Sequence, residues 1–478
     1  MSDLAMTVAS LQKYRHAGSP GRSGMTGPVI SPAPITAGVQ RFLSAAGRAL
    51  PSMAGIVAIG VGALLAGAFP AGAAETPPSW SGPISTAGVP VTATAAASAV
   101  MAQGVSANEI RFGIVAPFSG PNKDFGHQTQ VGIEAAFNTV NAAGGVFGRK
   151  LSLVTANDGY DPAKTADAMK QLDETQRVFG WVGNFGTATA AVSLPYALSR
   201  RMLFYGAYSG ANLLRRDPPD RYVFNFRASY AEEAFAAVHY LVKSRHLQPE
   251  QIAVFAQHDA FGDQGFQGVE KAMRTLNASG ESGSVLRLNY ERNTVNVDDA
   301  IAQLRQRPKN APQIKAVVMV AVYRPAAKFI EKTVDLFPGL IYTNVSAVGG
   351  TSLADELTVL GPKFASGVIV TQVVPAVDSY SSVVLDYKAA LAKSAPGEAP
   401  DYTSLESYLS ASVLIEGLKR AGADPDTEKL VTALESVHDF DLGVGPHITF
   451  GHEQHQALHK VWGTQLDAKG HYAPIDLE

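Results

Sequence analysis

Apolar, strand-like segments alternate with amphipathic, helix-like segments over most of the chain after residue 109. Strands separated by helices of about 10–15 residues form βαβ units, whose strands lie parallel in one sheet. The sequence therefore predicts an α/β protein with parallel sheets. The predicted strands span residues 110–116, 151–156, 180–183, 202–206, 251–256, 285–290, 316–322 and 367–373. The predicted helices span residues 162–176, 187–199, 231–243, 262–276, 297–306, 325–336, 381–393, 404–420 and 426–437.

The segment Ile110–Gly148 shows the repeating unit most fully. Its apolar strand is followed by the turn-rich loop Pro117–Gly126 and then by a helix, which Gly144 and Gly145 end. The apolar residues of that helix recur at i, i+3, i+4 and i+7, at Ile133, Ala136, Phe137 and Val140. In open α/β sheets, ligands bind at the loops that follow the carboxyl ends of the strands. We therefore expect the loop after the first strand to face a ligand.

The length of the chain predicts two such sheets. A doubly wound sheet of five or six strands uses about 120–150 residues, so the residues after 108 suffice for two doubly wound parallel-sheet lobes. Two lobes of this kind offer one obvious place for a small molecule, the cleft where both present their strand-end loops.

The first 108 residues differ in composition from the rest of the chain. Arg41 and Arg48 precede the apolar run Met53–Phe69, and the small residues Ala71-Gly72-Ala73 follow it. A basic flank, an apolar region and a small-residue exit predict an export signal. An uncleaved membrane anchor is the alternative, because about 18 apolar residues are borderline for a membrane span. The Ala-Gly-Ala exit and the glycines within the apolar run favour cleavage.

We accordingly assign residues 1–74 to an N-terminal extension with a signal peptide. Residues 75–108, rich in Ala, Pro, Ser and Thr, are assigned to a linker. The stretch before the apolar run is long for a signal peptide, so a translation start near Met25 is a second hypothesis.

Charge and cysteine content exclude several classes of partner and chemistry. The formal net charge is −3, so the chain lacks the basic footprint of a nucleic-acid-binding protein. The sequence contains no cysteine, which excludes disulfides, thiolate metal sites and cysteine nucleophiles. It also lacks the HExxH, G-x-S-x-G and P-loop motifs, and nothing in it calls for an enzyme or a cofactor.

The loop Gly183–Thr189 joins a short predicted strand to a helix. The position of Thr187 predicts that it is the N-cap of that helix. The free N–H groups at a helix N-terminus can bind a carboxylate or a phosphate. An ordinary capped helix without a ligand is the alternative. The glycines at 180, 183 and 186 have the spacing GxxGxxG, which does not match the dinucleotide-binding fingerprint.

Aromatic residues recur where predicted strands end. A single aromatic residue at such a position is most often ordinary packing, but a repeated one indicates the walls of an apolar pocket. The five residues are Phe125, Phe185, Tyr208, Phe261 and Tyr323. Gly206 and Gly210 flank Tyr208-Ser209, which suits a loop whose backbone closely approaches a ligand.

Histidines gather near the end of the chain. His452, His455 and His459 have i, i+3, i+7 spacing, which would place them on one face of a helix, and a zinc site there is one possibility. The adjoining Ile448-Thr449-Phe450 is strand-like and Gly451 disfavours a helix, so a solvated turn without metal is the favoured interpretation.

The chain resembles the branched-chain amino-acid-binding (Leu/Ile/Val-binding protein) family of periplasmic solute-binding proteins of ABC transporters. The resemblance covers about residues 109–466. The segments that carry it are GIVAPFSGPNKDFG, NAAGGVFGRK, NDGYDPAKTADAMKQL, VGNFGTATA, YVFNFRASY, AVFAQHDAFGDQG and YTSLESYLSASVLIEGL.

This resemblance implies a periplasmic, non-catalytic clamshell with two lobes and three hinge crossings. The implied lobes are residues 109–228 plus 374–443 and residues 229–373 plus 444–478. The protein would close on a small solute and deliver it to an ABC permease in the membrane, and we expect it to act as a monomer. A membrane-tethered sensor with the same clamshell is one alternative, and an exported, metal-assisted enzyme is another.

The resemblance also implies the ligand-binding residues. In the first lobe, the matching positions are Phe125, Thr187, Tyr208, Ser209 and Gly210. In relatives, the positions of Thr187 and of the 208–210 loop hold the α-carboxylate of the solute.

In the second lobe, Phe261 and Tyr323 match aromatic ligand contacts. Ser346 stands where amino-acid receptors place a glutamate for the substrate ammonium. A buried ammonium without a carboxylate partner is costly, so this departure argues against amino-acid specificity unless Glu406 substitutes for the missing glutamate. We therefore expect a carboxylate-bearing solute, either an amino acid or an acid with an apolar or aromatic body.

Overall fold

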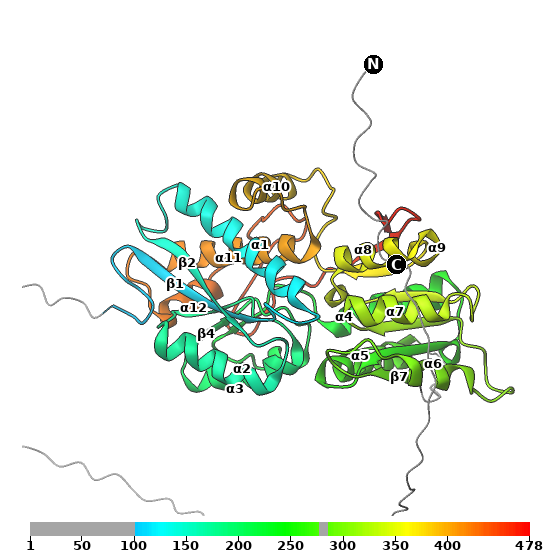
Figure 1. The fold of residues 1–478 in the computed structure, drawn as a ribbon. Coiled ribbons are helices and arrows are strands. Elements are labelled where there is room, and N and C mark those ends of the chain that lie inside the picture. Colours follow the sequence, from blue (N-terminus) through cyan, green and yellow to red (C-terminus); the bar gives the residue numbers. More distant parts are fainter. Residues whose placement is uncertain (1–100, 277–284) are drawn as a thin grey trace, which may run out of the picture. The chain divides into compact units, whose positions relative to one another are not determined.

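The computed structural model describes residues 101–276 and 285–478, and these belong to one compact unit, Thr94–Glu478 (Figure 1). The predicted signal peptide and most of the predicted linker lie outside the described residues. Among the helices of the two described ranges, none combines the length and apolarity that crossing a membrane requires.

The first sheet has five parallel strands in the order β2-β1-β3-β4-β5. The chain places β2 on one side of β1 and then β3, β4 and β5 on the other side, which is the doubly wound arrangement. The strands are β1 (Glu109–Ala116), β2 (Lys150–Asn157), β3 (Gly180–Val182), β4 (Leu203–Tyr205) and β5 (Val223–Phe224). Residues of β3, β4 and β5 are all buried, so the sheet needs helices on both faces.

Six helices accompany this sheet, and three of them come from late in the sequence. They are α1 (Lys123–Ala142), α2 (Pro162–Lys170), α3 (Thr187–Ser199), α10 (Ser382–Ser394), α11 (Tyr402–Ala421) and α12 (Thr427–Glu435). Helix α1 packs against α11 and α10 (Figure 1). Gly132 permits the close approach, because a Cβ there would lie 2.2 Å from the carbonyl oxygen of Ser404. We call this sheet with its helices the first lobe.

The second sheet has seven strands in the order β12-β11-β10-β9-β8-β6-β7. The strands are β6 (Ile252–Gln257), β7 (Leu286–Tyr290), β8 (Ala316–Val320), β9 (Ile341–Asn344), β10 (Ile369–Gln372), β11 (Trp462–Leu466) and β12 (Tyr472–Ile475). Strands β6 to β10 are parallel, whereas β11 and β12 add antiparallel strands at one edge.

We call the second sheet with its helices the second lobe. Its main helices are α4 to α8. They are α4 (Tyr230–His239), α5 (Ala260–Leu276), α6 (Asp298–Arg305), α7 (Tyr323–Thr333) and α8 (Gly350–Leu360). Short turns of helix include η5 (Ser346–Val348) and α9 (Pro362–Ala365). The predicted α/β class with parallel sheets is confirmed.

The chain passes between the lobes after β5, after β10 and before β11. The first and third passages run side by side, because Ala457 N–H donates to Asn225 O (2.8 Å) and Leu458 N–H donates to Phe226 O (3.0 Å). Before that point the chain still packs on the first lobe, where the His455 ring stacks on Phe224. We therefore propose that the third crossing follows Leu458, later than the boundary at residue 444 that the sequence suggested.

Candidate solute-binding site

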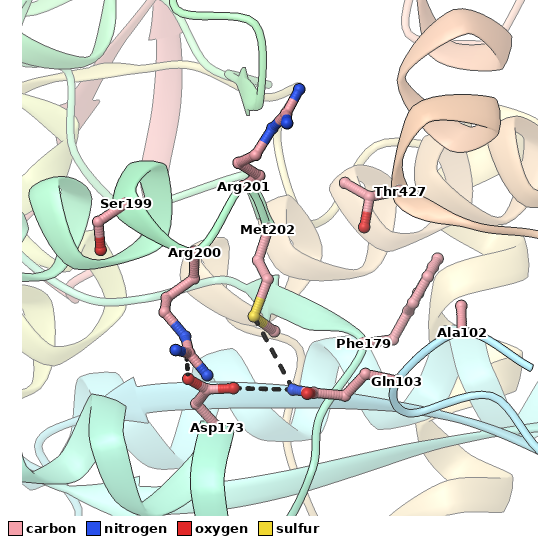
Figure 2. Close-up of a pocket in the computed structure, with 9 residues that line it drawn as sticks. All are labelled: Ala102, Gln103, Asp173, Phe179, Ser199, Arg200, Arg201, Met202 and Thr427. Carbon is pink, nitrogen blue, oxygen red and sulfur yellow. Dashed lines mark hydrogen bonds and ion pairs between the residues drawn. The ribbon is translucent and has the colours of Figure 1, made fainter.

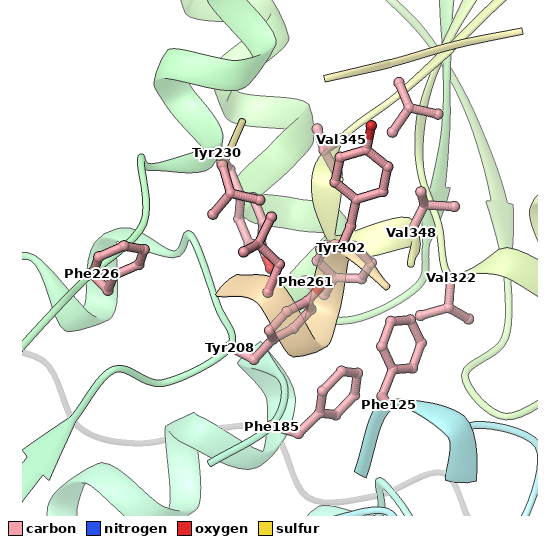
Figure 3. Packing of buried hydrophobic residues seen from close by; sticks show 14 of the residues in the cluster. Phe125, Phe185, Tyr208, Phe226, Tyr230, Phe261, Val322, Val345, Val348 and Tyr402 are labelled. Atoms are coloured by element: carbon pink, nitrogen blue, oxygen red, sulfur yellow. The ribbon is translucent and has the colours of Figure 1, made fainter. Parts of the chain in front are cut away.

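An aromatic cluster lies where the two lobes meet (Figure 3). The Phe125 ring, in the first turn of α1, has its centroid 4.6 Å from that of Phe185 and 5.9 Å from that of Tyr208. From the second lobe, Tyr323 at the start of α7 brings its ring centroid to 5.6 Å from Phe125. All four rings are buried, so four of the five predicted pocket aromatics pack on one another.

Close approach of the lobes at Phe125 requires a glycine opposite it. Gly349 has φ of 76°, a left-handed conformation, and a Cβ there would lie 2.7 Å from the Phe125 ring. Any other residue at this position would be strained and would also push the ring away. The sequence Val348-Gly349-Gly350 thus lets the second lobe pack directly against α1.

Beside the aromatic rings lies a cluster of three hydroxyl-bearing residues. Thr187 Oγ1 lies 2.7 Å from Ser209 Oγ, and both side chains are buried. Tyr230, at the start of α4, is also buried; burial raises the pKa of its hydroxyl, and the nearby Arg227 charge opposes the rise. The Tyr230 ring packs 5.3 Å from that of Phe261, which ties the second-lobe aromatic to this cluster.

The predicted N-cap role of Thr187 is wrong. Gly186, with φ of 92°, occupies the N-cap position, and Thr187 is the first residue of α3. A glycine at 186 accommodates the Tyr160 ring, which a Cβ would overlap, and this leaves the Thr187 hydroxyl free to bond to Ser209.

Polar contacts also join the lobes at the rim of the cluster. The Tyr323 hydroxyl lies 2.6 Å from Asp124 Oδ2 and 2.8 Å from Pro121 O. Burial, and then the neighbouring Asp124 carboxylate, raise the pKa of Tyr323. Gln257 Nε2 donates to the Tyr160 hydroxyl over 3.0 Å, which adds a second polar contact between the lobes.

A buried arginine occupies the first crossing between the lobes. Arg227 is fully buried, and its guanidinium carbon lies 4.4 Å from the centre of the Tyr208 ring. Its Nε is 3.1 Å from Glu406 Oε1, an ion pair without hydrogen-bond geometry, and its Nη2 donates to Ser346 Oγ. Among the described residues, neither Nε nor Nη1 has a hydrogen-bond partner.

Two buried carboxylates surround this arginine. Burial raises the pKa of Glu406 to about 7, against the opposing effect of the Arg227 charge. Burial also raises the pKa of Glu233, which accepts hydrogen bonds from Ser346 N–H (2.7 Å), Ser346 Oγ (3.0 Å) and Thr371 Oγ1 (2.6 Å). Burial lowers the pKa of the Arg227 guanidinium, but the nearby acidic groups, Glu406 first and then Tyr208 and Glu233, together outweigh burial and raise it.

All eight residues predicted to bind the solute therefore lie in one network of contacts. They are Phe125, Thr187, Tyr208, Ser209, Gly210, Phe261, Tyr323 and Ser346. The Tyr208 hydroxyl lies 3.5 Å from Ser346 O of the other lobe, and Gly210 lies against Tyr230. Their role in binding stays a prediction.

Sequence reasoning missed Arg227, Tyr230 and Glu233 as site residues. The signal for Arg227 was a charged residue between Phe226 and Ala228 in an otherwise apolar strand exit. Glu406, suggested as a substitute acceptor for an ammonium, is buried as that role needs, but it is ion-paired to Arg227.

A solute can enter only when these contacts separate. The cavity beside Tyr208 and Glu406 measures about 10 Å³, too small for an organic solute. A larger cavity of about 330 Å³ lies in the first lobe, near residues 101–103 (Figure 2). Its buried carboxylate, Asp173, is already bonded to Gln103, Tyr196 and Arg200, so this cavity presents no unpaired acidic group.

The histidines near the chain end lie beside different acidic side chains. His455 and His452 lie near Glu435, whereas His459 Nδ1 lies 2.6 Å from Glu232 Oε1. Within residues 101–276 and 285–478, no group of three or more histidine or acidic side chains is arranged to hold a metal ion.

Comparisons with known proteins agree with this architecture. The family model described as periplasmic binding protein matches residues 109–471. The chain is 27% identical to the Leu/Ile/Val-binding protein BraC3 of Rhizobium johnstonii over 375 residues, covering 76% of this chain and 92% of the relative.

Solved structures show the same fold. A possible leucine/isoleucine/valine-binding protein from Rhodopirellula baltica superposes with a TM-score of 0.72 at 34% identity, covering 78% of this chain and 97% of that one. LivJ of Streptococcus pneumoniae, solved with isoleucine, superposes with a TM-score of 0.63 at 16% identity, covering 77% and 99%.

Proposed function

This chain belongs to the periplasmic binding protein family, and we propose that it is the exported solute-binding component of an ABC importer. In this role it captures a small molecule in the periplasm and presents it to a membrane permease as a monomer. BraC3 is named a Leu/Ile/Val-binding protein and the Rhodopirellula protein a possible one, which supports solute binding as its role. We propose that it is not an enzyme, since the sequence carries no assembled nucleophile and base.

We propose that the solute binds between the lobes and combines a carboxylate with an apolar or aromatic body. The observation that carries this is the juxtaposition of the Thr187–Ser209 hydroxyl pair with the rings of Phe125, Phe185 and Tyr208. Hydroxyls bind a carboxylate well in a buried setting, and stacked rings enclose an apolar body.

Isothermal titration tests this proposal. The full chain is titrated with amino acids and with aromatic and aliphatic acids, with neutral sugars and alcohols of similar size as controls. We expect dissociation constants in the micromolar range or below for at least one carboxylate, and none for the controls. Tight binding of a neutral solute with no carboxylate binding would contradict the proposal.

A membrane-tethered sensor with the same clamshell is the second candidate, because the apolar run Met53–Phe69 approaches the length of a membrane span. Membrane fractionation and mass determination of the mature protein separate the two. A shortened chain recovered from the periplasm supports the importer component, whereas a full-length chain in the membrane fraction supports the sensor.

A further inference from the structure

We propose that Arg227, together with the Thr187–Ser209 hydroxyl pair, takes the carboxylate of the solute and that the solute lacks an α-ammonium group. This inference rests on the proposed function and narrows its substrate class to des-amino acids, such as aryl- or alkyl-alkanoates. Arg227 occupies the first crossing between the lobes and contacts Tyr208 and Ser346, two of the residues predicted to bind the solute.

The first step of the argument is the unmet hydrogen-bonding capacity of Arg227. Its guanidinium is fully buried, yet Nε and Nη1 have no hydrogen-bond partner in the described part of the chain. A buried donor without an acceptor destabilises the arrangement that holds it. A carboxylate can bind a guanidinium along its Nε–Nη2 edge or along its Nη1–Nη2 edge. In Arg227, each of these two edges therefore contains one nitrogen without a hydrogen-bond partner.

A carboxylate can accept hydrogen bonds from both nitrogens of such a guanidinium edge. Its two oxygens match the spacing of two guanidinium nitrogens, and charge-assisted bidentate pairs of this kind are among the strongest polar contacts in proteins. The Glu406 carboxylate stands near Arg227 as a counter-ion without making hydrogen bonds to it. A solute carboxylate with better geometry would displace it.

The same environment disfavours an ammonium group. At the position facing Arg227, Ser346 is neutral and already bonded to Glu233 and to the guanidinium. Glu233 accepts three hydrogen bonds, and Glu406 is paired with Arg227. A solute ammonium would have to take Glu406 from Arg227 and would lie beside a like charge, which is unfavourable in a desolvated site.

Matched pairs of solutes that differ only in the amino group test this inference. Isothermal titration at pH 7 compares 3-phenylpropanoate with L-phenylalanine and 4-methylpentanoate with L-leucine. We expect the des-amino acid of at least one pair to bind roughly 10-fold tighter or more than its amino acid. Tighter binding of the amino acids would overturn the inference and leave the proposed function intact. Failure of the folded protein to bind any acid would contradict the proposed function and, with it, the inference.

Three variants identify the residue responsible. Arg227→Gln should weaken binding of the preferred acid by roughly 10- to 100-fold, and Arg227→Lys should restore part of the loss. Arg305→Gln, an exposed arginine on α6, is the matched control and should leave affinity unchanged. Unchanged affinity in a folded Arg227→Gln protein would overturn the inference.

Glu406→Gln keeps the test decisive if the Arg227 variants do not fold. This substitution retains the size of the side chain and removes the competing carboxylate. If Arg227 binds the acid, affinity should rise several-fold in Glu406→Gln, because no counter-ion has to be displaced. A fall in affinity for the acid in Glu406→Gln would overturn the inference, because it would show that Glu406 itself contacts the solute.

Discussion

The hydroxyls of Thr187, the first residue of α3, and Ser209, in the loop after β4, lie 2.7 Å apart, and both side chains are buried. Thr187→Ala removes one half of this pair and should weaken binding of a carboxylate solute by about 1–2 kcal/mol, because one charge-assisted hydrogen bond is lost. Isothermal titration measures the change. Thr432→Ala, at an exposed position of α12, is the control and should bind as the wild type does. Equal affinities in all three proteins would remove Thr187 from the site.

The buried Glu406 gives stability a specific dependence on pH. Burial raises its pKa from an ordinary value of 4.5 to about 7, while Arg227 and Arg215 oppose the shift and Glu233 reinforces it. The folded state therefore binds the proton more tightly than the unfolded chain between these two values. The free energy of unfolding should fall as pH rises from about 4.5 to about 7, and this contribution of about 3 kcal/mol should then level off.

Glu406→Gln isolates this contribution from those of other groups. Urea unfolding at pH 5, 6, 7 and 8 should show that wild type loses stability relative to the variant as pH rises. Parallel pH profiles for the two proteins would show that the Glu406 carboxyl has an ordinary pKa in the folded state.

At this scale the sequence predicted which residues gather between the lobes better than it predicted their partners. Aromatic residues at strand ends and the Thr187 loop were identifiable because their positions follow from the βαβ pattern. The pairing of Arg227 with Glu406 was not, because a crossing segment and a helix far along the chain meet only in the folded protein. The pattern likewise could not show that Glu233 holds Ser346 in place.

Helices α1 and α7 belong to different lobes, and the Tyr323 hydroxyl connects them. Tyr323→Phe removes this contact while keeping the ring against Phe125. We expect it to disfavour the closed arrangement by about 1–2 kcal/mol and to weaken solute binding about 10-fold, because closure is part of binding. Titration gives the affinity, and urea unfolding should show little change in stability.

Tyr342→Phe is the matched control for this substitution. Its hydroxyl contacts Thr333 Oγ1 within the second lobe at 2.8 Å. The variant should be less stable by about 1 kcal/mol but should bind solute normally. If both variants affect stability and affinity alike, Tyr323 has no specific role in closure.

Among the elements, long periodic helices were predicted well and short elements were not. The predicted helix 187–199 agrees with α3 as observed, because its flanking loops carry clear turn residues. Strand β5 was missed, since two residues carry no periodicity, and it forms only by pairing with β4. Helix α8 was missed as well, although Gly349 precedes it as the N-cap.

The two lobes are joined by three passages and by direct contacts between their facing surfaces. The alternation of strands and helices was enough to predict the α/β class and two sheets. The third crossing that we propose after Leu458 depends on pairing between Asn225 and the segment that ends there, which a sequence pattern does not show. Residues 102 and 103 also differ from the predicted linker, since Ala102 packs on the core and Gln103 bonds to Asp173.

Small-angle X-ray scattering of the full chain with and without its tightest-binding acid tests the central claim most directly. If the solute binds between the lobes and they close on it, the radius of gyration should fall when the acid saturates the protein. Tyr323→Phe should require more acid for the same decrease. Saturation of the protein by the acid with no change in the radius of gyration would contradict binding in an interlobe cleft.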